Sequence, residues 1–151
     1  MRDQFCIGDR IAPDALAAAA SETQALFQAC RASWGDAFPQ GCAFSVSGGT
    51  SFCAASLQAG KLYPPAAPMP EMTREQCVAQ QARVCAIDLA ERKRLPGLPP
   101  DRADVMPAGF LIILAFLDAF GGNRFLPNHC NLRNALAQGM LDGTFPVLKH
   151  T

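Results

Sequence analysis

The sequence predicts an α/β fold in which helices predominate. Its 151 residues fit one domain, and composition and periodicity give five helical segments but only two short strand candidates. One of those strands leads directly through a pair of glycines into a helix, an arrangement typical of α/β folds. Because two short strands barely make a sheet, the chain is either mainly helical or part of a larger α/β body.

The first half of the chain predicts a helix, a strand and a second helix. Pro13 suits a first helical position, and the alanine-rich run that follows favours a helix from Pro13 to Ala32. Residues 43–47 alternate apolar and polar side chains and predict a strand, which runs through Gly48 and Gly49 into a helix over 51–58. The proline-rich segment 60–72 predicts a semi-rigid internal connection without regular structure.

The second half predicts three helices and one more strand. A helix over 73–94 should begin with a capping box, in which Thr73 and Gln76 satisfy each other's backbone N–H groups. The next helix should be kinked or broken at Pro107 and closed by two glycines, and its apolar run predicts burial. The remaining predicted elements are a break at 95–100, this helix at 101–120, a strand at 124–127 and a helix at 131–141.

Composition excludes several classes of protein. With 50% hydrophobic residues the chain is not intrinsically disordered, and a net charge of zero argues against nucleic acid or an anionic membrane as the main partner. Its most strongly apolar uncharged run, 105–117, is shorter than the roughly 18 residues that a membrane span needs. The charged fraction of 17% is below the usual value of about 25%. This shortfall suggests that part of the surface is covered by a binding partner.

Cysteine spacing predicts thiols that act as small buried hydrophobes. The seven cysteines form no CxxC or CxxxC pair, so we expect neither zinc nor a disulfide scaffold. We therefore expect a cytoplasmic protein with reduced thiols. The chain also lacks GxSxG, HExxH and GxxxxGK[ST] motifs, and we assign no catalytic residue and no metal ligand.

The best local candidate for a binding site is the turn Ser47–Gly48–Gly49–Thr50. Glycines allow a ligand to approach the backbone, the following helix N-terminus presents N–H groups to an anion, and the two hydroxyls add donors. A tight strand-to-helix turn also needs glycine for its geometry alone, so the pattern leaves both interpretations open. Arg102 and Arg133 are candidates for charge contacts with a phosphate, or for pairing with carboxylates.

Three segments resemble one family in the same order along the chain. Residues 95–109 are similar to the LPGL-x-P-x-RADVI-x-AG signature of the exopolyphosphatase / guanosine pentaphosphate phosphatase (Ppx/GppA) family. Residues 44–50 resemble its GVGGT loop, and Asn131–Arg133 resembles its GLREG segment. The resemblance covers residues 43–141, with Ser47 and Asn131 in place of glycines and Asn134 in place of a glutamate.

The resemblance implies a fold and a chemistry. The family belongs to the actin-like (RNase-H-like) ATPase superfamily, whose two lobes surround a cleft, and it removes phosphate from polyphosphate or guanosine pentaphosphate with Mg²⁺. On this basis residues 1–151 form one incomplete C-terminal lobe, in which Ser47–Thr50 form a wall of the phosphate or nucleotide cleft. Arg102 and Arg133 would add positive charge there.

The segments of the family that this sequence lacks indicate what activity to expect from the chain. The first lobe with its catalytic glutamate, and the DIGGGS loop that opens the second lobe, have no counterpart in this sequence. We therefore expect the chain alone to be inactive, as a fragment of an enzyme from a truncated gene or from a gene split in two. In the second case the missing N-terminal lobe would be a separate chain and a partner. The alternatives are a non-catalytic phosphate- or nucleotide-binding module, and a helical interaction protein that pairs with itself, as a homo-oligomer, or with another chain. We expect no cofactor in this chain, since Mg²⁺ is implied for the complete family enzyme.

Overall fold

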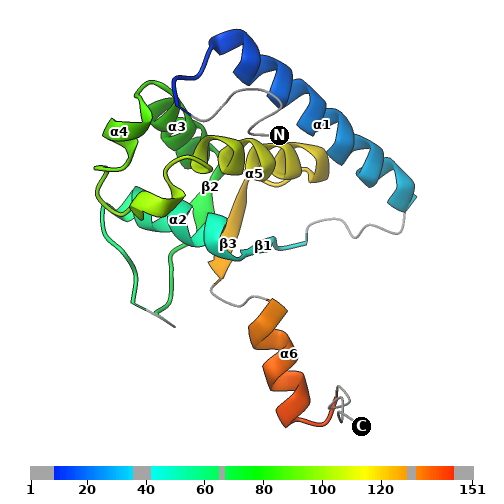
Figure 1. The fold of residues 1–151 in the computed structure, drawn as a ribbon. Helices are drawn as coiled ribbons and strands as arrows, with labels where there is room; N and C mark the ends of the chain where they lie inside the picture. The colour runs from blue at the N-terminus through cyan, green and yellow to red at the C-terminus, as the bar shows by residue number, and fades with distance from the viewer. Residues whose placement is uncertain (1–8, 36–41, 65–66, 129–131, 145–151) are drawn as a thin grey trace, which may run out of the picture.

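The structure is a computed structural model that describes residues 9–35, 42–64, 67–128 and 132–144 (Figure 1). Helices predominate and the sheet is small, as the sequence predicts. In chain order the elements are α1 (Pro13–Trp34), β1 (Ser45–Ser47), α2 (Gly49–Ala59), β2 (Met72–Thr73), α3 (Arg74–Cys85), α4 (Leu89–Arg92), the 3-10 turn Pro100–Arg102, α5 (Met106–Phe120), β3 (Arg124–Asn128) and α6 (Leu132–Leu141).

The described strands form one three-stranded sheet in the order β1-β3-β2. β1 runs parallel to β3, with Ser45 opposite Leu126 and Ser47 opposite Asn128, and β2 runs antiparallel to β3. The prediction of two strands was therefore incomplete. β2 has only two residues, too few for an alternating pattern to be visible in the sequence.

Helix α5 lies at the centre of the fold, between α1 and the sheet (Figure 1). It packs against α1, α2 and α3, and most of its side chains are buried. Phe110, Ile113 and Leu117 pack into the same core as Leu57 of α2 and Phe125 of β3. The prediction that this apolar run is a buried helix is confirmed.

The predicted helices over 73–94 and 101–120 differ clearly from the structure, whereas the other helix boundaries agree within two residues. The single helix expected over 73–94 is wrong, because α3 ends at Cys85 and α4 begins anew behind Asp88. Asp88 caps α4 through a capping box with Glu91, which favours a fresh helix start over continuation. The helix expected from Asp101 begins only at Met106. Pro107 therefore lies in its first turn, where proline is tolerated, and the predicted kink or break at Pro107 is wrong.

Other local predictions are confirmed. The Thr73–Gln76 capping box is present at the start of α3, and Gly121 ends α5 in the left-handed conformation. The segment 60–72 has no helix, and only Met72 at its end belongs to a strand, within the part that the structure describes. Among the described residues, no helix is long and apolar enough to cross a lipid bilayer.

Candidate anion-binding site

The turn between β1 and α2 has the predicted strand–glycine–helix form. Gly48 precedes α2 with φ 100° and ψ −176°, a conformation that side-chain-bearing residues rarely adopt. Its N–H donates to the Asn128 carbonyl at 3.3 Å, which anchors the turn to β3. Its carbonyl accepts from the Phe52 N–H at 3.2 Å and from the Ser51 hydroxyl at 3.0 Å. Glycine is therefore required at 48 by the backbone itself.

The N-terminus of α2 carries no side-chain cap. Gly48 makes no side-chain capping bond, and the first turn of α2 contains no acidic residue. Backbone N–H groups at a helix start have no partner within the helix, and the helix dipole places partial positive charge there. The beginning of α2 thus has the chemistry to accept an anion.

Arg102 lies against this helix start, although it is far from Gly49 in the sequence. A Cβ atom placed on Gly49 would be 3.8 Å from the Cζ atom of Arg102, so the guanidinium is in van der Waals range of the glycine. The Arg102 side chain is 55% exposed, and its nearest described carboxylate contact is Asp101 at 3.9 Å. The structure thus brings two separately predicted candidates, the glycine turn and Arg102, to one place.

Thr50 has a packing contact that sequence reasoning missed. A Cβ atom on Gly109 of α5 would lie 2.6 Å from the Cγ2 methyl of Thr50, so α2 and α5 approach closely at this point. Gly109 ends the segment 95–109 that resembles the family signature. That segment therefore contacts the turn at two points, through Arg102 at Gly49 and through Gly109 at Thr50.

Cys53, one turn into α2, is a buried thiol in this neighbourhood. Burial raises its pKa to about 11, Arg102 opposes that rise, and Asp101 adds to it. The thiol is consequently protonated and neutral near pH 7, and cannot act as a nucleophile or as a thiolate ligand there.

Of the remaining predicted residues, Ser47 lies at the turn, and no described contact brings Arg133 there. Ser47 is exposed at the end of β1, next to the turn. Arg133 belongs to α6 by its backbone, but its side chain lies outside the described part of the chain, as does Asn131. α6 stands away from the other helices in Figure 1.

The residues around the turn do not fit a magnesium site. Mg²⁺ prefers carboxylate oxygens; the first turn of α2 has none, and Asp101, beside Arg102, is a single exposed carboxylate that contacts that arginine. Within the described ranges, no group of three or more His, Cys, Asp or Glu side chains could hold a metal ion. We therefore derive no metal-dependent step from this chain.

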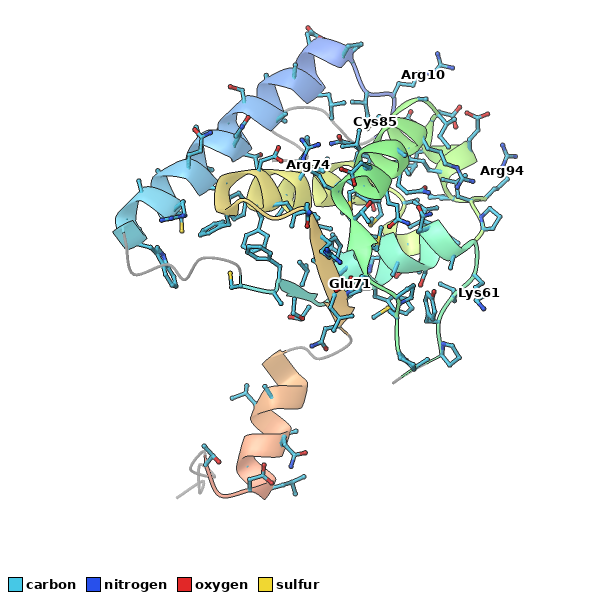
Figure 2. All side chains as sticks on the ribbon, turned by 180° about the vertical axis from the view of Figure 1, so that it is seen from behind. Arg10, Lys61, Glu71, Arg74, Cys85 and Arg94 are labelled. Atoms are coloured by element: carbon cyan, nitrogen blue, oxygen red, sulfur yellow. The ribbon has the colours of Figure 1, made fainter. Side chains whose placement is uncertain are left out.

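A cavity of about 510 Å³ lies at the opposite end of the same strands. Its lining includes Phe44 before β1, Glu71, and the segment that leads into β3. Arg124 of β3 and Glu71 form an exposed ion pair of 3.5 Å there, and Glu71 is labelled beside β2 and β3 in Figure 2. The candidate anion site at Gly48–Thr50 is separate from this cavity.

Comparisons with known proteins identify a shared fold. No family model matches the chain, and no curated protein is significantly similar to it in sequence. Among solved structures, it matches the type II variant of a Ppx/GppA phosphatase from Aquifex aeolicus with TM-score 0.74 and 19% identity, covering 92% of this chain and 45% of that one. It matches an exopolyphosphatase from Cytophaga hutchinsonii with TM-score 0.77 and 16% identity, covering 93% of this chain and 46% of that one.

The chain therefore spans less than half the length of the structures that it matches. At these identities the likeness concerns the fold, and it agrees with the C-terminal part that the sequence resemblance covers. The chain thus has the fold of a part of Ppx/GppA proteins, and the resemblance predicted from residues 44–50 and 95–109 is confirmed at that level.

Proposed function

We propose that this chain is the phosphate-binding part of a Ppx/GppA-type, actin-like body. The backbone N–H groups at the start of α2 and the guanidinium of Arg102 would hold a phosphate group of polyphosphate or guanosine pentaphosphate. The observation that carries the proposal is the position of Arg102, whose Cζ lies 3.8 Å from the Cβ position of Gly49 beside an uncapped helix start. A guanidinium and several N–H donors are the groups that recognise phosphate oxygens.

The proposed activity of the chain alone is binding without hydrolysis. Phosphoryl transfer needs a group that orients the nucleophile and positive charge that neutralises the transition state. The first turn of α2 supplies no carboxylate, the exposed carboxylate of Asp101 contacts Arg102 at 3.9 Å, and the neighbouring thiol of Cys53 is neutral near pH 7. The catalytic base would have to come from another part of a complete enzyme.

Binding of inorganic tripolyphosphate, measured by titration calorimetry, tests this proposal. Arg102→Ala should weaken binding about tenfold, because a charge-assisted hydrogen bond is lost. Arg94→Ala is the matched control, since Arg94 is an exposed arginine that points outward in Figure 2. It lies in the segment leading to Gly97, which contacts the opposite end of α2. No binding by the unchanged chain, or equal binding by both variants, would contradict the proposal.

A second proposal is that another polypeptide covers one face of this chain. β1 is an edge strand among the described strands, and an apolar groove of about 250 Å³ runs beside it. Phe27 of α1 and Ile112 and Phe116 of α5 line this groove, and Ile112 is 44% exposed. An exposed apolar groove beside an open strand edge is suited to accept a further strand. The partner would be the N-terminal lobe that the family resemblance implies or, in a homo-oligomer, a second copy of the chain.

Light scattering of the purified chain tests the second proposal. The unchanged chain should self-associate as its concentration rises, or bind a co-expressed N-terminal lobe, and Ile112→Asp should abolish both while preserving the helical circular dichroism signal. Association that Ile112→Asp leaves unchanged would contradict the proposal.

We further propose that the protein acts in the cytoplasm, since Cys53 and Cys77 are free, buried thiols.

A further inference from the structure

Arg92 is a fully buried arginine, with 0% of its surface exposed. It ends the short helix α4 and reaches three carbonyl groups on different segments. Its Nε donates to the Ile87 carbonyl at 3.3 Å, its Nη1 donates to the Ala103 carbonyl at 3.2 Å, and its Nη2 donates to the Asp9 carbonyl. Arginine is almost never fully buried without such partners.

The bond to Ala103 concerns the candidate anion site directly. Ala103 follows Arg102 and is itself fully buried, so its carbonyl fixes the chain where the 3-10 turn ends. The turn is otherwise held by local backbone bonds, from the Arg102 N–H to Pro99 at 2.9 Å and from the Val105 N–H to Arg102 at 3.2 Å. Arg92 supplies a side-chain bond that ties this turn to α4.

The groups around Arg92 act on its pKa in opposite directions, and the net shift is downward. Burial lowers its pKa, while nearby Cys85, Asp9, Asp88 and Asp104 raise it. An arginine remains charged under these conditions, and its planar group donates in several fixed directions at once. A lysine has the same charge but cannot reproduce that planar geometry.

We propose that Arg92 is a positioning residue for Arg102. By bonding the Ala103 carbonyl, it fixes the turn so that the guanidinium of Arg102 lies against Gly49. The consequence for anion affinity rests on the proposed function, whereas the positioning itself does not.

The positioning is tested in the absence of any ligand by nuclear magnetic resonance of the full chain. The unchanged protein should show a nuclear Overhauser contact between the Gly49 α-protons and the Arg102 side chain. Arg92→Lys should lose this contact while the resonances of α5 persist, and Arg94→Lys, the matched control, should retain it. A retained contact in folded Arg92→Lys would overturn the proposal.

If Arg92→Lys fails to fold, the same measurement is made on a second variant, Arg92→Gln, which keeps a planar donor at the end of a shorter side chain. Global unfolding of both Arg92→Lys and Arg92→Gln would also overturn the proposal, because Arg92 would then support the whole fold rather than one turn.

The affinity is tested by a double-mutant cycle with inorganic tripolyphosphate. Arg92→Lys should weaken binding by up to about tenfold in the unchanged background and should have no further effect when Arg102→Ala is present. Equal losses in both backgrounds would show that Arg92 acts without Arg102 and would overturn the inference. If the unchanged chain binds no tripolyphosphate, the proposed function fails, and the contact between Gly49 and Arg102 still decides the positioning.

Discussion

Helices α5 and α6 are both rich in apolar residues, but their surroundings are opposite. Most side chains of α5 are buried among α1, α2, α3 and the sheet. In α6, Leu136 is 42% exposed, Met140 is 45% exposed and Leu141 is 82% exposed. Figure 1 shows α6 apart from the helices that surround α5. The comparison shows that apolar composition alone does not decide whether a helix is buried. A helix becomes buried only where other helices or a sheet pack against its apolar side chains.

The largest difference is expected from truncating one apolar side chain in each helix. Phe110→Ala should lower the free energy of unfolding by about 4 kcal/mol, because Phe110 is fully buried in the core. Leu136→Ala in α6 should lower it by less than about 0.5 kcal/mol. Chemical denaturation of the two variants measures both values. Similar losses would mean that α6 packs on the body in solution.

A second, smaller difference is expected between glycines of the packed and unpacked parts. Gly97 has φ 83°, and a Cβ atom there would lie 2.0 Å from the Ser56 carbonyl oxygen. Gly97→Ala should therefore cost about 3 kcal/mol, through strain and displacement of α2. Gly143, after α6, has φ 71° but no atom within 4 Å of that position.

Gly143→Ala is consequently the matched control for the glycine at 97. It shares the positive φ but lacks the steric conflict, so it should change the stability of the body by less than about 0.5 kcal/mol. Thermal unfolding of the two variants separates the contributions. A small effect at both positions would show that the segment before α5 can move away from α2.

The smallest expected difference concerns pH, since α5 packs near buried thiols and α6 contains no cysteine. Burial raises the pKa of Cys53 to about 11 and that of Cys77 to about 12, from an ordinary value of 9.0. Above pH 9 the unfolded chain releases these protons while the folded chain keeps them, so stability should fall as pH rises from 9 to 11.

The expected loss is on the order of 2 kcal/mol for the two thiols by about pH 10. Urea unfolding at several pH values measures it. The double variant with Cys53→Ala and Cys77→Ala is less stable at neutral pH but should lose most of this pH dependence. An unchanged slope in that variant would assign the pH dependence to other groups.

Local chemistry was the part of the fold that the sequence could predict. The Thr73 capping box, the glycine end of α5 and the strand–glycine–helix turn depend on residues that are close in sequence, and all three are present. The long helix over 73–94 was wrong because two local preferences compete there. Helical periodicity favours continuation past Cys85, whereas the cap at Asp88 starts a new helix.

The candidate site was predicted only in pieces. Gly49 and Arg102 were both candidates, but their contact depends on how the start of α2 lies against the 3-10 turn Pro100–Arg102, which no local pattern encodes. The contact between Gly109 and Thr50 was missed for the same reason. The role of Arg92 was also missed, because a basic residue near the end of a predicted helix is usually explained by helix capping. A glycine within an apolar helix was the one available hint of close helix approach.

The register of β1 against β3 sets an order of events during synthesis. Ser45 pairs with Leu126, and its hydroxyl donates to the Leu126 carbonyl across a separation of 81 residues. β1 therefore leaves the ribosome long before its only described strand neighbour exists, and such distant pairing is slow. We expect the turn at Gly48, which bonds to Asn128 at the end of β3, to be among the last parts of the chain to acquire its native geometry.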